Sequence, residues 1–371
     1  MIIDRTKRKI SANWWWTIDR YILSISLGLI LLGFILTLAA SPRVANRIGL
    51  EDFYFVKRQV AFILIGFVII ATTSLFSSAS VRRFSVVGFL LFYILLISVE
   101  FLGAETKGAK RWINLMGISV QPSEILKPFF AVLCAWFINR GKIEEKFRGT
   151  IISFALLLAV VFFTIRQPDF GMSITFSMIW GSMLVVAGLH FIIIILIGFL
   201  GLGGGYSAYL FLPHVRKRVD SFLNPESSAS ENYQTFKSLQ AFESGSITGV
   251  GPGQGKVKDI LPDAHTDFIF SVAGEEYGVF FCLLIIGLFL TLVIMSLKRA
   301  YESKDLFIML AITGLITQIF VQSAVNMAVA VNLIPNKGMT LPFISYGGSS
   351  MVSISFAVGM ILALTRKKFG E

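Results

Sequence analysis

Cysteine is scarce in this sequence of 371 residues. The two cysteines, Cys134 and Cys282, both lie in apolar runs. Two such residues cannot build a disulfide framework, and neither has a histidine neighbour that would indicate a metal site. The chain is therefore not a disulfide-stabilised domain, and its cysteines point to no metal centre.

Charged residues are also few, at 15% of the chain, and only 22 of them are acidic. Hydrophobic residues make up 55%, and the mean hydropathy is +0.76. This is too apolar for a soluble domain of this length and indicates a multi-span membrane protein. The 33 basic residues would suggest nucleic acid on a soluble protein, but here they fit the flanks of membrane spans. We therefore expect membrane lipid, and no nucleic acid, as a partner.

The long apolar runs set the fold class. A span needs about 20 mostly apolar residues, and runs of this length are helical because a helix satisfies its own backbone hydrogen bonds in lipid. No cleaved signal peptide is expected, because the first run is too long for one and has many successors. The sequence predicts an all-α integral membrane protein with ten transmembrane helices, over 21–40, 57–76, 84–103, 121–138, 150–165, 170–188, 191–211, 268–297, 306–331 and 343–364.

The distribution of Lys and Arg orients these helices. An even number of spans puts both termini on one side, and the short loops of that side carry far more Lys and Arg than those opposite. Both termini are therefore predicted to be cytoplasmic. The expected order is a cytoplasmic segment (1–20), helices 1–7 (21–211), a large extracytoplasmic, or periplasmic, loop (212–267), helices 8–10 (268–364) and a cytoplasmic tail (365–371).

The loop over 212–267 is far longer than most connections, and such loops are usually functional or disordered. Its residues 225–231, PESSASE, have the composition of a flexible segment. Residues 245–255, GSITGVGPGQG, instead predict a set of shaped turns that use the positive φ values of glycine. They are not a phosphate-binding P-loop, because Val250 and Val257 stand where that motif needs a glycine and a hydroxyl.

An ionisable pair stands at the start of the eighth span, in the stretch PDAHTDFIF over 262–270. Asp267 has two interpretations: a general base at the mouth of a membrane cavity, or, like Thr266, a cap on the helix that follows. Position alone favours neither. His265 is more simply a hydrogen-bonding loop residue than a catalyst.

A second group of charges surrounds the fourth span. Glu124 and Lys127 are three residues apart and can pair within the helix. Together with Arg111 they form either a structural ion pair beside an interface anchor or the charged wall of a pocket for an anionic substrate. Intramembrane ionisable residues favour the second interpretation. In the turn over 166–171, RQPDFG, Asp169 is expected mainly to cap a helix.

Two further candidates lie in outer segments. Lys337 can bind phosphate or extend to lipid headgroups, and it precedes Ser345 in a stretch rich in Pro, Gly and hydroxyl side chains. Irregular backbone at membrane depth is tolerated only where it is buried in protein or lines a cavity. Arg216, in the run HVRKR, either contacts the lipid surface or a pyrophosphate-bearing lipid.

Together these segments resemble the SEDS family of polytopic cell-wall proteins. The resemblance extends over roughly residues 20–365. Within the family the sequence is similar to the division branch, because Lys337 stands where the rod-elongation branch has an apolar stretch. The matching motifs are KGAKRWINL (107–115), QPSEILK (121–127), RQPDFG (166–171), GVGPGQGKVKDILPDAHTDFIFSVAGEEYG (249–278) and PNKGMTLPFISYGGSS (335–350).

The resemblance implies a peptidoglycan glycosyltransferase that polymerises lipid II, an undecaprenyl-pyrophosphate disaccharide pentapeptide, during septal wall synthesis in cell division. The essential aspartate of the family falls on Asp267, which favours the general base. The remaining site residues would bind or surround the substrate: Arg111, Glu124, Lys127, Arg216, His265, Lys337 and Ser345. A divalent cation, Mg²⁺ or Mn²⁺, fits such a reaction, although no ligand spacing identifies its site.

The resemblance also implies a place and partners. The expected location is the bacterial inner membrane at the division septum, with a class B penicillin-binding protein transpeptidase and other division proteins as partners. Two other functions stay open at this point. A cavity with buried charges and a broken last span would also suit a lipid II flippase, and the chain can be a non-catalytic division scaffold.

Overall fold

The chain forms a mostly helical membrane protein. A computed structural model describes residues 14–106, 109–115, 117–144, 146–189, 191–223 and 229–366. The helices are α2 (Trp14–Thr17), α3 (Arg20–Arg47), α4 (Tyr54–Ser74), α5 (Ser78–Leu102), α6 (Pro122–Ile143), α7 (Gly149–Arg166), α8 (Phe170–Val186), α9 (Phe191–Phe211), α10 (Pro213–Leu223), α11 (Ala229–Gly245), α12 (Val257–Ile260), α13 (Ile269–Glu302), α14 (Leu306–Ala330) and α15 (Gly348–Leu364). The strands are β1 (Ala104–Thr106), β2 (Ala109–Leu115) and β3 (Ile118–Val120).

The long helices α3–α9 and α13–α15 each contain most of one predicted span. Over the described residues, α3, α4, α5, α7, α13 and α14 are long and apolar enough to cross a membrane, and α8 and α15 are apolar but shorter. The last helix begins at Gly348 rather than near 343. Residues before it form an irregular turn, in which Phe343 has a φ of 65° that no helix can contain.

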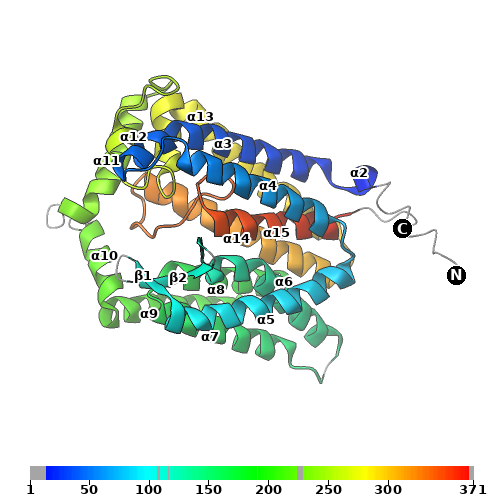
Figure 1. Cartoon of the computed structure of the whole chain (residues 1–371). Coiled ribbons are helices and arrows are strands. Elements are labelled where there is room, and N and C mark those ends of the chain that lie inside the picture. Colours follow the sequence, from blue (N-terminus) through cyan, green and yellow to red (C-terminus); the bar gives the residue numbers. More distant parts are fainter. Residues whose placement is uncertain are drawn as a thin grey trace.

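The core lies where α6, α8, α14 and α15 meet. α14 packs against α6, α8, α13 and α15. In its most apolar stretch of 18 residues, 78% of the residues are buried. In Figure 1, α3, α4 and α13 lie on one side of α14 and α15, and α5, α7, α8 and α9 lie on the other. Loops and the short helices α11 and α12 gather at one end of this bundle, and α2 lies at the opposite end. The helices thus place the loop segments that carry the candidate site at a single end.

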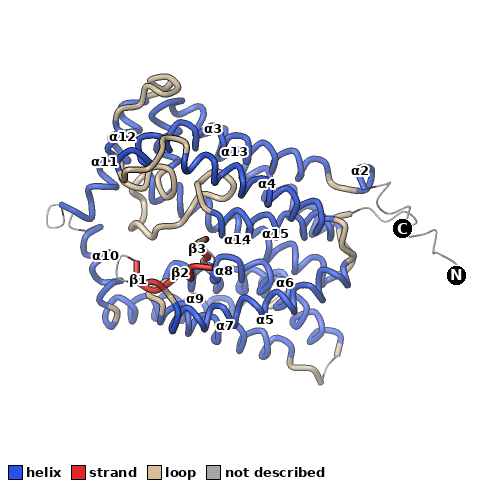
Figure 2. Tube along the Cα trace, viewed as in Figure 1, coloured by secondary structure: helices blue, strands red, loops and turns tan. Residues whose placement is uncertain are grey.

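A small antiparallel sheet follows α5, and the all-α prediction did not include it. The strand order is β1-β2-β3 (Figure 2). Ile113 lies opposite Val120. Gly117, with a φ of 82°, allows the tight turn between β2 and β3. Strand β2 has only seven residues, and it lies between two long apolar runs. The sequence signal of the membrane spans on either side was stronger than that of so short a strand.

The segment predicted as a loop over 212–267 contains three helices, α10, α11 and α12. Part of the stretch predicted to be flexible, 225–228, lies outside the described residues, while 229–231 begin α11. The shaped turns predicted over 245–255 are confirmed, because Gly249, Gly251 and Gly253 all have positive φ.

These turns close a break in α13. Gly278 leaves the helical conformation with a φ of 76°, and this frees carbonyl groups in the preceding turn. The backbone N–H of Val250 donates to the oxygen of Glu275 at 2.9 Å, and that of Gly251 donates to the oxygen of Glu276 at 3.0 Å. A membrane helix can be interrupted here because the glycine turns satisfy its freed backbone groups.

Candidate functional site

Asp267 lies in a tight turn between α12 and α13, and its side chain is half-buried. The turn is organised by Asp263, whose φ is 54° and whose carbonyl oxygen accepts from the N–H groups of Thr266, Asp267 and Phe268 at 3.1 to 3.3 Å. The N-cap position of α13 belongs to Phe268. Neither Thr266 nor Asp267 therefore occupies the N-cap position considered for them.

Asn326 joins this turn to the segment that precedes α15. Its amide Nδ2 donates to the main-chain oxygen of Asp267 at 2.7 Å and to that of Met339 at 2.6 Å. Asn326 lies in α14, most of whose residues are buried, and is itself almost fully buried. It therefore fixes the two loop segments relative to each other from a rigid element.

Gly338 brings the segment close to the Asp267 carboxylate. A Cβ atom at this glycine would lie 3.3 Å from Oδ2 of Asp267. Gly338 has a φ of 64°, a conformation that glycine adopts without strain. The preceding residue, Lys337, is half-buried, and its Cδ atom would lie 3.5 Å from a Cβ added at Gly171 in the first turn of α8. Carboxylate and cation thus belong to adjoining loop segments at one end of the bundle.

A chain of amides supports the segment from its other side. Asn336 donates to Oε1 of Gln234 at 3.0 Å, and Gln234 donates to Oδ2 of Asp263 at 3.3 Å. The N–H of Gly338 donates to Oδ1 of Asn336 at 2.9 Å. Through Gln234, helix α11 of the long connection is therefore linked both to the turn of Asp267 and to the segment of Lys337.

Arg111, on β2, binds the turn between α7 and α8. Its Nε donates to the oxygen of Gln167 at 3.2 Å, another guanidinium nitrogen donates to the oxygen of Pro168, and Nε lies 4.0 Å from Oδ2 of Asp169. Asp169 accepts from the N–H of Met172 at 3.2 Å, so the capping role predicted for it is confirmed. Arg111 thus holds the turn that begins α8, and the Lys337 side chain packs against the first turn of that helix, at Gly171.

Glu124 and Lys127 form the ion pair predicted for them, with 2.7 Å between Nζ and Oε2. The Lys127 side chain is fully buried, and its Nζ also donates to Oε1 of Gln322 at 2.7 Å. Gln322 in turn donates to the oxygen of Thr340 at 3.2 Å and to Ser350 Oγ at 3.3 Å. This network ties α6 and α14 to the segment before α15, so the pair is connected to the site through protein contacts.

His265 and Ser345 lie beneath the surface, between the same two loops. The His265 ring packs against Phe55 and Tyr346, with centroid distances of 4.5 and 5.4 Å. Burial lowers the pKa of His265 to about 4, although the Asp263 carboxylate opposes the shift. Ser345 Oγ donates to the oxygen of Thr266 and accepts from the N–H of Leu341 at 2.8 Å. Both residues join the two loops.

No described contact places Arg216 near Asp267 or the other candidate residues. It is exposed on α10, where its Nε lies 3.5 Å from Oδ2 of Asp220. Among the described contacts, α10 packs against α9 and α11 (Figure 1). In the described part of the chain, no group of three or more His, Cys, Asp and Glu side chains is placed to hold a metal ion.

The sequence did not single out four buried polar residues: Asn326 and Gln322, which contact the segments of the site, and Lys258 and Glu276. The first two are amides within the apolar α14, where an amide also serves as an ordinary helix contact. Lys258 and Glu276 form a buried ion pair between α12 and α13. Their charges, inside or beside a membrane span, could have drawn attention to Lys258 and Glu276. No sequence feature near either residue indicated that the two pair.

Comparison with known proteins gives the family of the chain. A family model described as "Cell cycle protein", FTSW_RODA_SPOVE, matches residues 19–369. A protein of Caulobacter vibrioides named "Probable peptidoglycan glycosyltransferase FtsW" is 39% identical over 367 residues, which cover 99% of this chain and 94% of that protein.

Solved structures share the fold. One belongs to a peptidoglycan synthase complex described for its coordination of polymerization and crosslinking; it has a TM-score of 0.78 and 24% identity, covering 94% of this chain and 97% of that one. Thermus thermophilus rod shape determining protein RodA has a TM-score of 0.71 and 22% identity, covering 95% and 97%.

Proposed function

Because the chain belongs to the cell cycle protein family of FtsW, RodA and SpoVE, we propose that it is a peptidoglycan glycosyltransferase that polymerises lipid II during cell division. The relative from Caulobacter vibrioides is named "Probable peptidoglycan glycosyltransferase FtsW", and it matches nearly the whole chain. The observation that carries the proposal is the position of Asp267, a half-buried carboxylate beside Gly338 and Lys337 at one end of the helix bundle.

Asp267 is assigned the role of general base. The acceptor sugar hydroxyl is a poor nucleophile until a positioned base accepts its proton, and such a base contributes about 10²- to 10⁴-fold to the rate. The carboxylate suits this role because its turn is held by Asp263 and Asn326 rather than by the substrate. Its partial exposure leaves it open to a sugar, while the helices behind it can contact lipid.

Lys337 is assigned the stabilisation of the leaving group. Negative charge develops on the lipid pyrophosphate as the glycosidic bond breaks, and a fixed cation aimed at that charge lowers the barrier. Arg111 is assigned a positioning role, because its donors already bind the turn that begins α8. Glu124, Lys127, His265 and Ser345 maintain the shape of the site, and Arg216 contacts anionic lipid at a distance from it.

The described carboxylates and histidines do not form a protein-only metal site. Mg²⁺ is commonly bound by one or two carboxylates together with substrate phosphates. A divalent cation that arrives with the pyrophosphate therefore remains part of the proposal, and no step is assigned to it.

The proposed topology has ten spans, α3–α9 and α13–α15, in the bacterial inner membrane, with both termini in the cytoplasm. The distribution of Lys and Arg in the short loops supports this orientation. The end of the bundle with Asp267 would then face the periplasm, where lipid II is polymerised. A class B penicillin-binding protein is the proposed partner at the septum, since a structurally similar chain belongs to a peptidoglycan synthase complex.

The test is polymerisation of lipid II by the purified protein, with Asp267→Asn beside the wild type. Loss of at least about 100-fold in rate is expected, because the amide cannot accept the proton. Asp263→Asn is the matched control: it removes the same charge four residues away, while its amide oxygen can still accept from Gln234. The control should retain activity.

The alternatives give other results in the same assay. Unchanged polymerisation by Asp267→Asn would remove this carboxylate from the mechanism. Translocation of labelled lipid II across vesicles by both proteins, without polymer from either, would indicate a flippase. A wild type that does neither, while it still binds its division partners, would be a scaffold.

A further inference from the structure

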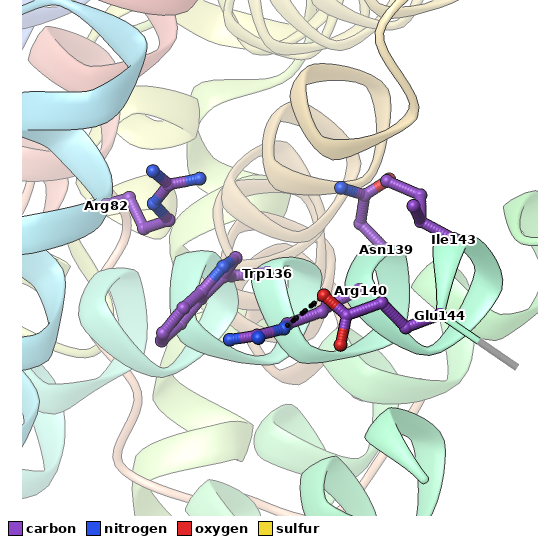
Figure 3. A pocket seen from close by; sticks show the side chains of 6 residues that line it. All are labelled: Arg82, Trp136, Asn139, Arg140, Ile143 and Glu144. Atoms are coloured by element: carbon purple, nitrogen blue, oxygen red, sulfur yellow. Dashed lines mark hydrogen bonds and ion pairs between the residues drawn. The ribbon is translucent and has the colours of Figure 1, made fainter. Parts of the chain in front are cut away.

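A hollow of about 300 Å³ lies at the end of α6 opposite the candidate site. It is lined by Arg82 in the second turn of α5 and by residues of the last turns of α6, with Glu144 just beyond: Trp136, Asn139, Arg140, Ile143 and Glu144 (Figure 3). Helix α6 has 22 residues, so its two ends are separated by roughly 30 Å, the thickness of a bilayer core. The hollow and Asp267 are therefore on opposite faces of the proposed membrane.

Three hydrogen-bond donor groups around the hollow have no side-chain acceptor among the described residues. The Arg82 guanidinium lies 5.6 Å from the Trp136 ring centroid, and among the described residues it makes no ion pair. The Trp136 indole N–H and the Asn139 amide likewise have no side-chain partner in the described part of the chain. Figure 3 shows all three side chains around the same space, contributed by two different helices.

Among the described residues that line the hollow, Glu144 is the only carboxylate, and it already has a partner. Glu144 Oε1 accepts from Arg140 Nε at 3.0 Å, and both side chains are about half exposed. The Arg140 guanidinium also lies 5.0 Å from the ring centroid of Phe147. The described lining is therefore cationic, because the Arg82 guanidinium pairs with no carboxylate among the described residues. A planar guanidinium beside amide and indole donors matches the oxygens of a phosphate group.

Apolar side chains are exposed on α6 and on α7, which packs against it. Ile143, which lines the hollow, is 72% exposed, and Ile151 and Phe154 on α7 are 60% and 42% exposed. These side chains suit lipid tails, while Trp136 has the amphipathic character of a residue at the membrane interface. A ligand held here would have its charged group among the donors and its apolar part along α6 and α7.

We propose that this hollow binds the phosphate group of an anionic membrane phospholipid, in the leaflet opposite the candidate active site. Basic pockets between transmembrane helices on the cytoplasmic side are suited to such headgroups. The same phosphate chemistry occurs in soluble phosphate esters, so the experiment separates the two sources. This site is independent of the polymerisation proposed above.

The experiment measures lipid binding to the full chain in detergent by native mass spectrometry. Phosphatidylglycerol is titrated against phosphatidylcholine for the wild type, Arg82→Gln and Arg83→Gln. Arg83 is the matched control, because it is the next residue in sequence, carries the same charge, is exposed and does not line the hollow. A preference of the wild type for phosphatidylglycerol is expected, weakened about tenfold in Arg82→Gln and retained in Arg83→Gln.

A second arm uses sn-glycerol 3-phosphate as the soluble probe, with the thermal unfolding midpoint as the readout. A response to phosphatidylglycerol but not to the soluble ester supports a lipid headgroup site. An equal response to both at equal concentration would leave a phosphate site and overturn the lipid assignment. Equal weakening in Arg82→Gln and Arg83→Gln would overturn the site itself, since diffuse surface charge would then account for binding. Asn139→Leu, which removes a donor without changing charge, should also weaken binding even if Arg82→Gln does not fold.

Discussion

The side-chain amide of Asn326 donates a hydrogen bond to the main-chain oxygen of Asp267, at 2.7 Å. The same nitrogen donates to the oxygen of Met339 at 2.6 Å, two residues after Lys337. One buried amide of α14 therefore sets the separation of the two loops that carry the proposed base and the proposed cation. This relationship connects a residue of the helix core to the reaction without any contact between that residue and substrate.

Asn326→Leu is expected to lower kcat by roughly 10- to 100-fold, because a displacement of about 1 Å in a reacting group can cost 100-fold. The substitution also leaves two carbonyl oxygens without their donor, at about 1–3 kcal/mol for each buried group. The measurement is the rate of lipid II polymerisation at several substrate concentrations, which separates kcat from KM. A positioning role predicts a loss chiefly in kcat.

Gln318→Leu is the control for Asn326→Leu. Gln318 is a fully buried amide in the same helix, and its side-chain atoms have no hydrogen-bond partner among the described residues. Its replacement should leave polymerisation unchanged and stability equal or higher, because no satisfied polar group is lost. Equal losses of activity in both variants would show that α14 tolerates no amide substitution, and Asn326 would lose its specific role.

Much of this arrangement could be predicted from the sequence, because the signals were local. Long apolar runs located the spans, and α9 begins and ends at the predicted residues, 191 and 211. Asp169 was expected as a cap from the Pro-Asp pair before an apolar run, and Gly249 to Gly253 were expected in turns from their spacing. Each of these depends on residues within a few positions of one another.

The rest depended on contacts between distant segments. Asn326 and Asp267 are separated by 59 positions, and Arg111 and Pro168 by 57. Arg111 was expected at the substrate, and its donors bind the α7–α8 turn, because an Arg needs acceptors and the turn offers carbonyl oxygens. Helix α11 was missed because its polar sequence resembles a surface loop, and its support comes from packing against α13.

Gly33→Ala is expected to destabilise the protein and reduce polymerisation. A Cβ atom at Gly33 would lie 2.4 Å from the oxygen of Phe343 and 2.6 Å from Cα of Ile344, so α3 or the turn before α15 must move. That turn contacts the loop of Asp267, since the N–H of Tyr346 donates to the oxygen of His265 at 2.9 Å. Overpacking of this kind costs about 1–3 kcal/mol.

Thermal unfolding and polymerisation of Gly33→Ala check this expectation, with Gly28→Ala as the control. Gly28 lies in the same helix, and nothing lies within 4 Å of a Cβ added there. Gly28→Ala should match the wild type or exceed it slightly, since alanine favours helix. If the two variants behave alike, the close approach of α3 to residues 343 and 344 is not a constraint on the site.

Stability is expected to fall as the pH decreases from about 6.5 to about 4, through His265. Burial holds the pKa of His265 at about 4, below its ordinary value of 6.5, so the folded protein keeps this ring neutral. Well above pH 6.5 neither state binds the proton, and the free energy of unfolding is independent of this residue. Below it only the unfolded state binds the proton, which removes roughly 3 kcal/mol by pH 4.

His265→Phe isolates this contribution, because the ring can still pack against Phe55 and Tyr346 but no longer titrates. The measurement is the unfolding midpoint in detergent from pH 8 to pH 4 for both proteins. The difference between them should be constant above pH 7 and shift in favour of the variant below it. Parallel curves over the whole range would show that His265 titrates normally.

Glu276→Gln is expected to destabilise the protein by about 3–5 kcal/mol, because it leaves Lys258 buried without a counter-charge. Nζ of Lys258 pairs with Oε1 of Glu276, and both side chains are almost fully buried. The same Nζ donates to the oxygen of Ala39 at 2.9 Å, which ties α3 to this pair. The loss should appear as a lower unfolding midpoint at neutral pH.

The double variant Lys258→Met with Glu276→Leu distinguishes two explanations of that loss. Either the protein needs the ion pair itself, or it only cannot tolerate one buried charge without the other. Removal of both partners leaves no unpaired charge, and apolar replacements of buried ion pairs are often neutral or stabilising. The double variant should therefore recover most of the stability lost in Glu276→Gln. Glu275 should be left unchanged in this test, because its carboxylate accepts from the N–H groups of Val257 and Lys258 at 2.7 and 2.8 Å and holds α12 independently. If the double variant is no more stable than Glu276→Gln, the bond from Lys258 to Ala39 and not the ion pair holds α3 and α12 in place.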